Sequence, residues 1–349
     1  MTPLNQPELE EFAALRKVSA EIGADPMLVQ SAGGNTSIKD GDVMWIKASG
    51  TLLADAEDKD IFVPVDLLKM RRSMLAGEAR ADQPAEFLLP GGLDLRPSIE
   101  TSLHAVFSQK IVLHAHCIHT IVHAVQVERE ELLATTLAGL NWALVQYVKP
   151  GATLANLVIQ RLDGKTNVVV LGNHGVIVAG DSVEQAHALL IEVHKRLAID
   201  SQPEVAPDLT SLEELAQSSE YVLPEYLMLH QLALDPVRVK QATSGSLYPD
   251  HVIFCGIGAT ALADDESPIQ AKTRVLKTGA PAPVFLIVPE QGVLVRRDAS
   301  SGAHALMRCL VDVLLRLPVD AELCYLTHEQ NLELLDWDAE KYRKALNAE

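Results

Sequence analysis

The stretch Ile111-Val-Leu-His-Ala-His116 predicts the element around which this chain folds. Its first three residues, 111–113, are apolar and β-forming, so they predict a buried strand that ends at His114 and His116. Side chains alternate along a strand with a period of two, and both imidazoles therefore project from one face. The sequence thus places a pair of histidines at one strand end.

A second apolar run leads to a third histidine. Residues 168–171 predict another buried strand, which is followed by the turn Gly172-Asn173 and by His174. Two histidines from one strand and a third from a neighbouring strand end are typical of a catalytic zinc site with three protein ligands and one open position. A single core histidine is usually a hydrogen-bonded structural residue, but this combination of motifs favours a metal site. We therefore expect His114, His116 and His174 to be metal ligands.

Two loops rich in small residues, 31–37 and 48–51, form a second chemical feature. Their glycines let the backbone approach a ligand closely. The neutral hydrogen-bonding side chains of the two loops are Asn35, Ser37, Ser49 and Thr51. Together with the positive charge of Lys47 they indicate an anion or polyol cradle. Two ordinary turns are the alternative, and the loops taken alone favour it, since the same residue types dominate turns.

A carboxylate follows these loops in the segment 96–104, which predicts the start of a helix with Ser98 as N-cap. Glu100 would lie in the first turn, where an acid commonly complements the helix dipole. The functional alternative is a carboxylate beside the metal that moves a proton to or from carbon. Its place one helix upstream of the histidine strand permits this role.

Composition limits the class of protein and its compartment. The formal net charge of −18 argues against a nucleic-acid partner and against attachment to an anionic membrane surface. The cysteines are scattered without a Cys-x-x-Cys motif, which indicates reduced thiols. The polar, acidic start of the chain is unlike a signal peptide, and no apolar run approaches the roughly 20 residues of a membrane span. We therefore expect a cytoplasmic protein that acts on a small molecule.

Taken together, the motifs resemble those of the class II aldolase/adducin family over about residues 8–200. The matching motifs, in the family's order and approximate spacing, are Gly34-Asn-Thr-Ser37, Lys47-Ala-Ser-Gly50, Pro97-Ser-Ile-Glu100, His114-Ala-His116 and Asn173-His-Gly175. The resemblance implies an α/β fold in which residues 1–200 form a three-layer α/β/α domain with a mixed or largely antiparallel central sheet. It also implies a homo-oligomer, specifically a tetramer.

The same resemblance assigns roles to individual residues. It implies that His114, His116 and His174 hold zinc, or manganese or cobalt in its place, and that Glu100 is the acid/base residue. The residues that match substrate-phosphate contacts, with Lys47 as an addition, are Asn35, Ser49, Gly50 and Ser98. Tyr147 is a candidate for the family's proton-donating tyrosine.

By this resemblance the chain is a metal-dependent lyase of the aldolase type, an enzyme of carbohydrate metabolism. Zinc would stabilise the enediolate formed when a C–C bond in a sugar or sugar phosphate is cleaved. Ile99 stands where fuculose-phosphate aldolases have a second serine, which removes one phosphate donor. The alternatives are epimerisation, decarboxylation or dehydration on the same site, or a non-catalytic adducin-like scaffold.

A polar, proline-containing segment, 201–209, predicts a boundary before a smaller α/β domain at 210–349. Within that domain, residues 290–298 align without a gap on 173–181, and Gln291 stands where His174 stands. This similarity indicates either a degenerate repeat that has lost its metal site or a chance recurrence of strand, turn and helix.

A third class of function is suggested by Gly256-x-Gly-x-x-Ala261, which matches a dinucleotide-binding fingerprint if residues 252–255 form a strand. The segment that follows breaks the expected helix almost at once, and no acid lies about 20 residues further on. An NAD-dependent dehydrogenase is therefore the weakest of the alternatives.

Overall fold

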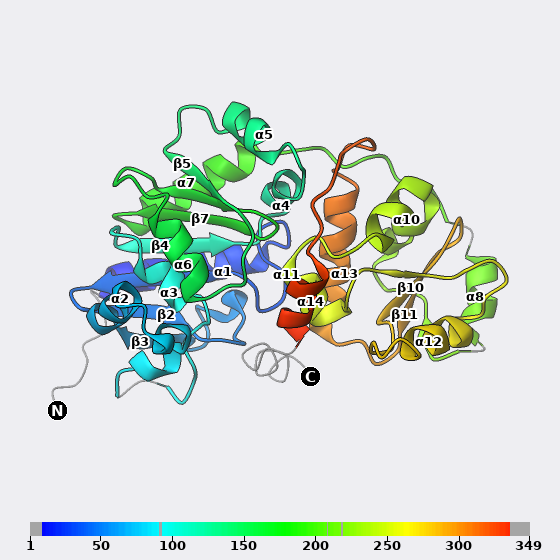
Figure 1. Ribbon diagram of the computed structural model, residues 1–349, viewed down its shortest axis with the longest axis horizontal. Helices are drawn as coiled ribbons and strands as arrows, with labels where there is room; N and C mark the ends of the chain where they lie inside the picture. The colour runs from blue at the N-terminus through cyan, green and yellow to red at the C-terminus, as the bar shows by residue number, and fades with distance from the viewer. Residues whose placement is uncertain (1–8, 91–92, 208, 218, 336–349) are drawn as a thin grey trace. The chain divides into compact units, whose positions relative to one another are not determined.

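The computed structural model describes residues 9–90, 93–207, 209–217 and 219–335 (Figure 1). The described chain divides into two compact units. The first contains residues 9–124 and 129–198, and the second contains residues 125–128 and 199–335.

The first unit is built on a mixed sheet, seven-stranded within the described residues, with the order β3-β2-β1-β4-β7-β6-β5. Its strands are β1 (Asn35–Asp40), β2 (Val43–Lys47), β3 (Phe62–Asp66), β4 (Ile111–Ala115), β5 (Trp142–Val145), β6 (Val168–Leu171) and β7 (Gly175–Gly180). Among the described pairs, β5 and β6 run parallel and the others antiparallel. The predicted α/β fold with a mixed central sheet is confirmed.

Helices cover both faces of this sheet, so the unit has three layers (Figure 1). The helices are α1 (Leu9–Ala24), α2 (Leu67–Leu75), α3 (Thr101–Ala105), α4 (Ile118–Ala124), α5 (Arg129–Thr136), α6 (Ala152–Ile159) and α7 (Val183–Arg196), with short 3-10 turns at Leu53–Asp55, Ala79–Asp82 and Pro84–Phe87. Helices α1 and α7 pack on one face, and α2, α3 and α6 pack on the other.

The alternation along β4 decides which face carries the site. Ile111 and Leu113 pack in the core beneath α1 and α7, whereas Val112 packs on the opposite side with α3 and α6. Because side chains alternate with a period of two, His114 lies on the same face as Val112. The histidines are therefore directed toward the face that also carries the helix after Glu100.

Two boundaries differ from the sequence-based predictions. The sequence of residues 64–75 predicts a helix, but helix α2 begins only at Leu67, because residues 62–66 pair with β2 as the edge strand β3, where a proline is tolerated. Asp66 then caps the helix by accepting a hydrogen bond from the Lys69 backbone at 2.8 Å. The prediction of Ser98 as an N-cap was also wrong, since Glu100 occupies that position of α3.

The second unit contains a sheet, four-stranded within the described residues, with the order β8-β11-β10-β9. Its strands are β8 (Tyr221–Val222), β9 (Thr260–Ala261), β10 (Phe285–Val288) and β11 (Gly292–Arg296). Its helices are α8 (Thr210–Gln217), α9 (Gln231–Leu234), α10 (Pro236–Thr243), α11 (Pro249–Cys255), α12 (Pro268–Leu276), α13 (Ser301–Leu314) and α14 (His328–Leu335), with a 3-10 turn at Leu227–His230. The sequence of residues 327–348 predicts one or two short helices, and the part of this stretch beyond residue 335 lies outside the described residues.

The strand expected at 252–255 is wrong, because these residues belong to helix α11, which ends at Gly256 with φ of 91°. The Gly-x-Gly-x-x-Ala motif therefore follows a helix instead of a strand, and the local structure that a dinucleotide fingerprint requires is missing there. Within the described part of the chain, no helix combines the length and apolarity needed to cross a membrane.

Candidate metal centre

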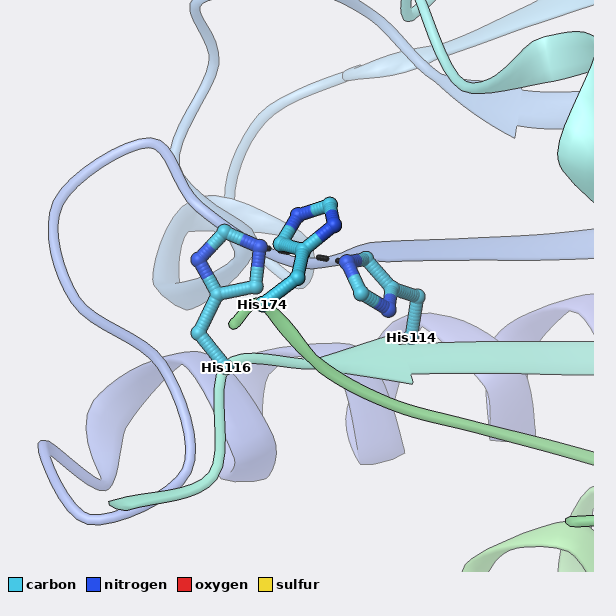
Figure 2. A group of neighbouring side chains, drawn as sticks. All are labelled: His114, His116 and His174. Atoms are coloured by element: carbon cyan, nitrogen blue, oxygen red, sulfur yellow. Dashed lines mark hydrogen bonds between the residues drawn. The ribbon is translucent and has the colours of Figure 1, made fainter. Parts of the chain in front are cut away.

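The structure brings the three predicted histidines together (Figure 2). His114 is on β4, His116 directly follows that strand, and His174 lies in the turn between β6 and β7. Their ligand nitrogens lie within 4.8 Å of one another, and each pair of ring centroids is 4.9 Å apart. All three side chains are buried. The cluster is therefore compatible with metal binding.

The turn that carries His174 depends on two backbone features. Asn173 adopts a left-handed conformation with φ of 55°, and the His174 N–H donates to the Leu171 carbonyl at 3.1 Å. At Gly175, a Cβ would lie 2.4 Å from the Ala115 oxygen. Only glycine therefore lets β7 begin this close to the end of β4, which is what brings His174 to the other two histidines.

A hydrogen bond from its Nδ1 atom fixes the orientation of the His114 ring. Its Nδ1 lies 3.0 Å from the Val176 carbonyl oxygen, which can only accept, so Nδ1 carries the proton and Nε2 is left as a neutral ligand atom. The Nε2 atoms of His114 and His116 are 3.1 Å apart. Tetrahedral coordination at about 2.1 Å puts ligand nitrogens roughly 3.4 Å from one another. The donor set thus fits a small divalent ion.

Glu100 faces this cluster with one oxygen. Its Oε1 lies 3.4 Å from Nε2 of His114 and 3.5 Å from Nε2 of His174, and it receives no hydrogen bond from the described residues. Its Oε2 accepts a hydrogen bond from Asn35 Nδ2 at 2.7 Å. Burial by itself would raise the pKa of Glu100, but the positive charge of the facing imidazoles in their protonated form and the hydrogen bond from Asn35 outweigh it and lower the pKa to about 2. The group is therefore a carboxylate at neutral pH.

The candidate substrate-binding residues come from segments that lie next to one another. Asn35 pairs with His114 across β1 and β4, and its amide also donates to Ser98 Oγ at 2.8 Å. The Ser49 N–H donates to the Arg96 carbonyl at 2.8 Å, which joins the 48–51 loop to the segment before Glu100. Gly50 has φ of 80°, a conformation that favours glycine.

Lys47 has a role that its position in the sequence did not indicate. Its ammonium donates to the carbonyls of Ala32 and Gly34 at 3.0 and 3.2 Å, and its side chain is buried. Lys47 thereby stabilises the conformation of the 31–37 loop through two backbone carbonyls of that loop. Its direct contact with a substrate stays a prediction.

Tyr147 lies in the segment after β5. Its backbone nitrogen is 3.2 Å from the point that a Cβ on Gly172 would occupy, so this segment packs against the turn that carries His174. The Tyr147 side chain is partly buried. Its role as a proton donor stays a prediction.

His104 was not predicted as part of the site. It lies one helical turn after Glu100, and its backbone N–H donates to the Glu100 backbone carbonyl at 3.1 Å. Its Nδ1 is 2.8 Å from Ser37 Oγ, which ties α3 to β1. Burial lowers the pKa of His104 to about 3, so the ring is neutral at physiological pH. The four-residue spacing of Glu100 and His104 was the available signal.

Comparison with known proteins gives a family for the first unit. A model of the class II aldolase and adducin N-terminal domain matches residues 14–200, which is more than half of the chain. The uncharacterized oxidoreductase YuxG of Bacillus subtilis (strain 168) is 27% identical over 186 residues, which are 49% of this chain. The match spans only 27% of the length of that relative.

Solved structures resemble about half of the chain. The N-terminal class II aldolase domain of a conserved protein from Thermoplasma acidophilum is 25% identical, with a TM-score of 0.49 over 56% of this chain and 96% of that one. A sugar-phosphate aldolase from Thermotoga maritima is 15% identical, with a TM-score of 0.42 over 54% of this chain and 92% of that one.

Proposed function

The chain belongs to the class II aldolase and adducin family, and from this premise we propose that it is a metal-dependent lyase of the aldolase type. The observation that carries the proposal is a buried cluster of three histidine nitrogens with an ionised carboxylate oxygen 3.4–3.5 Å from two of them. The substrate we propose is a hydroxylated carbonyl compound, a sugar or its phosphate. The ligands of the ion are His114, His116 and His174, and zinc is the ion that three imidazoles favour.

A zinc ion bound there supplies a Lewis acid for the negative charge that develops on substrate oxygens when the C–C bond breaks. Glu100 holds or moves the proton at its Oε1, because Asn35 occupies Oε2 and keeps Oε1 directed toward the histidines. The loops at 31–37 and 48–51 hold the oxygen-rich substrate with backbone N–H groups and hydroxyls. Their position beside Glu100 supports this assignment.

Ile99, in place of a second serine, favours a substrate without a phosphate at that position. A screen of retro-aldol cleavage should therefore include ketose phosphates, free ketoses and free keto acids. Cleavage of any of these to a carbonyl product supports the lyase. Turnover of the same panel without retro-aldol cleavage, by epimerisation, loss of water or release of CO2, would replace it by an epimerase, dehydratase or decarboxylase that uses the same charge stabilisation.

Metal content provides the first test. We expect about one zinc per chain in purified protein, and loss of that metal in His116→Ala with an unchanged circular dichroism spectrum. His187→Ala, in helix α7, is the matched control and should keep its zinc. A chain that takes up no metal after supplementation would favour the non-catalytic adducin-like scaffold instead.

A further inference from the structure

Helix α3 begins directly after Glu100 and is too short to be stable by its own hydrogen bonds. It contains five residues, and helices of fewer than about 12 residues are marginal without tertiary contacts. Glu100 is the N-cap residue of this helix, so the carboxylate moves with it. The groups that anchor α3 therefore determine where Oε1 of Glu100 lies.

One face of strand β1 is directed toward this helix. Asn35 and Ser37 are two residues apart on the strand, so their side chains project from the same face. Ser37 pairs with Val112, which packs on the side of the sheet that carries α3 and α6. Both polar side chains are buried. The strand thus offers two buried hydrogen-bonding groups to the helix that follows Glu100.

Two side-chain hydrogen bonds join this face to the helix. Asn35 Nδ2 donates to Glu100 Oε2 at 2.7 Å, and one turn further on Ser37 Oγ lies 2.8 Å from His104 Nδ1. Residues two apart on a strand are separated by about 6.6 Å, and residues four apart on a helix by about 6 Å along its axis. The two bonds therefore lie side by side. Because there are two, α3 cannot slide or rotate along β1 without breaking one of them.

His104 is completely enclosed and does not carry protons. Its side chain and that of Ser37 have no exposed surface. Burial lowers the pKa of His104 to about 3, so the ring is a neutral hydrogen-bonding partner at physiological pH. Ser37, a candidate donor of the predicted cradle, is directed to His104 and does not reach a ligand. Neither side chain can exchange a proton with a substrate.

The end of α3 is anchored to a different element. Arg71, on helix α2, donates from Nε to the Ala105 carbonyl at 2.7 Å and from Nη2 to the Phe107 carbonyl at 2.8 Å. Within the described part of the chain, His104 is the residue of 101–105 whose side chain bonds to β1. Loss of that bond leaves the hydrogen bond of Glu100 itself as the side-chain link between α3 and β1.

We propose that His104 is a positioning residue, which acts through Ser37 to hold Glu100 Oε1 against the three histidines. The proposal rests on the proposed lyase activity and adds to it a residue outside the ligand set. A displacement of about 1 Å at a reacting group can cost about 100-fold in rate. The bond between His104 and Ser37 therefore acts on kcat more than on substrate binding.

Kinetics of His104→Leu and Ser37→Ala, with a substrate found in the screen, test the proposal. We expect kcat to fall roughly 10–100-fold in each, with KM within about twofold of wild type and zinc content unchanged. His104→Asn should restore most of kcat, because its amide has a donor and an acceptor close to the position of Nδ1. The matched control is Ser102→Ala, which changes a buried serine of the same helix that has no hydrogen-bond partner among the described residues.

The double variant Ser37→Ala with His104→Leu separates the loss of this bond from a general loss of packing. Both changes remove the same bond, so the double variant should be about as slow as the slower single variant. Fully additive losses, wild-type kcat in His104→Leu, or no recovery in His104→Asn would each overturn the proposal.

Crystal structures of the single variants, in the same metal state as the wild type, give a readout that needs no turnover. We expect Glu100 Oε1 to move by roughly 1 Å from its place 3.4 Å from His114 Nε2 and 3.5 Å from His174 Nε2. An unmoved Glu100 would overturn the positioning role. A displaced Glu100 would support that role even where the wild type cleaves no member of the panel, a result that rejects the lyase alone.

Discussion

At the level of a single residue, the two oxygens of Glu100 have different surroundings, which supports the role in proton transfer that we propose for it. Asn35 holds Oε2 by a hydrogen bond, whereas Oε1 faces the histidine nitrogens. A carboxylate held in this way has one oxygen for positioning and one for proton transfer. Replacing it by the isosteric amide removes the proton chemistry and keeps the shape.

We therefore predict that Glu100→Gln retains its metal and fold but loses a factor of about 10²–10⁴ in kcat, the usual contribution of a general acid or base. The measurement is kcat with any substrate found in the screen, together with the zinc content of the same sample. Glu184→Gln, in helix α7, serves as the control and should behave as wild type. Wild-type turnover in Glu100→Gln would show that the proton is handled elsewhere.

Lys39 gives a pH-dependent prediction that is independent of the metal. Burial, followed by the charge of Arg71, lowers the pKa of Lys39 from 10.5 to about 7, and its Nζ donates to the Gln109 carbonyl at 2.9 Å. Between these two pKa values the unfolded chain binds the proton and the folded chain does not. The free energy of unfolding therefore rises with pH across this window, by up to about 1.4 kcal/mol per pH unit.

Lys39→Met should remove this rise. Denaturant unfolding at about pH 7.5 and about pH 9.5 would compare the two proteins. We expect the wild type to gain stability relative to Lys39→Met at the higher pH. Parallel curves for the two proteins would mean that Lys39 is charged in the folded state.

At the level of elements, the end of β4 and the beginning of β7 act as one structure, because Gly175 lets the two backbones approach closely. The same pairing holds the His174 turn beside His116. Metal affinity should therefore depend on the backbone of this turn, although Gly175 offers no ligand atom.

Gly175→Ala should lower the free energy of unfolding by about 1–3 kcal/mol, because the new Cβ forces the strands apart. It should also lower zinc affinity, since His114 lies at the end of β4 and His116 directly follows that strand. Gly41→Ala is the matched control, because Gly41 has φ of 55° and open space around it. It should lose about 1 kcal/mol by backbone strain alone and keep its zinc affinity. Unchanged zinc affinity in Gly175→Ala would show that the backbone of this turn does not influence metal binding.

At the level of the whole molecule, each compact unit has hydrophobic clusters of its own. The three histidines of the candidate metal centre all belong to the first unit. A metal that binds only the folded state stabilises the unit that holds it, by about 2.7 kcal/mol at a hundredfold excess over Kd.

Removal of the metal with a chelator should therefore lower the melting transition of the first unit and leave that of the second unchanged. Differential scanning calorimetry with and without chelator would show this, with His116→Ala as the variant that no longer responds. Equal shifts of both transitions would indicate that the two units unfold together. A single unshifted transition would contradict zinc binding at the histidine centre.

The sequence by itself determined the parts of this protein that depend on local spacing. The histidine cluster was predicted from two motifs: His-x-His after one apolar run, and a glycine-flanked histidine after a second apolar run. Both motifs depend on strand periodicity and turn chemistry, which act over a few residues. The ordered motifs likewise gave the family and the mixed α/β fold, which the family model confirms.

Only the tertiary structure decided the features that depend on distant pairing. Residues 62–66 form an edge strand because β2 lies beside them, and residues 252–255 form a helix although their composition is typical of a strand. Lys47 braces a loop because folding brings the carbonyls of that loop to its ammonium. Such roles depend on which segments come into contact in the folded protein. The spacing of side chains along the sequence does not indicate those contacts.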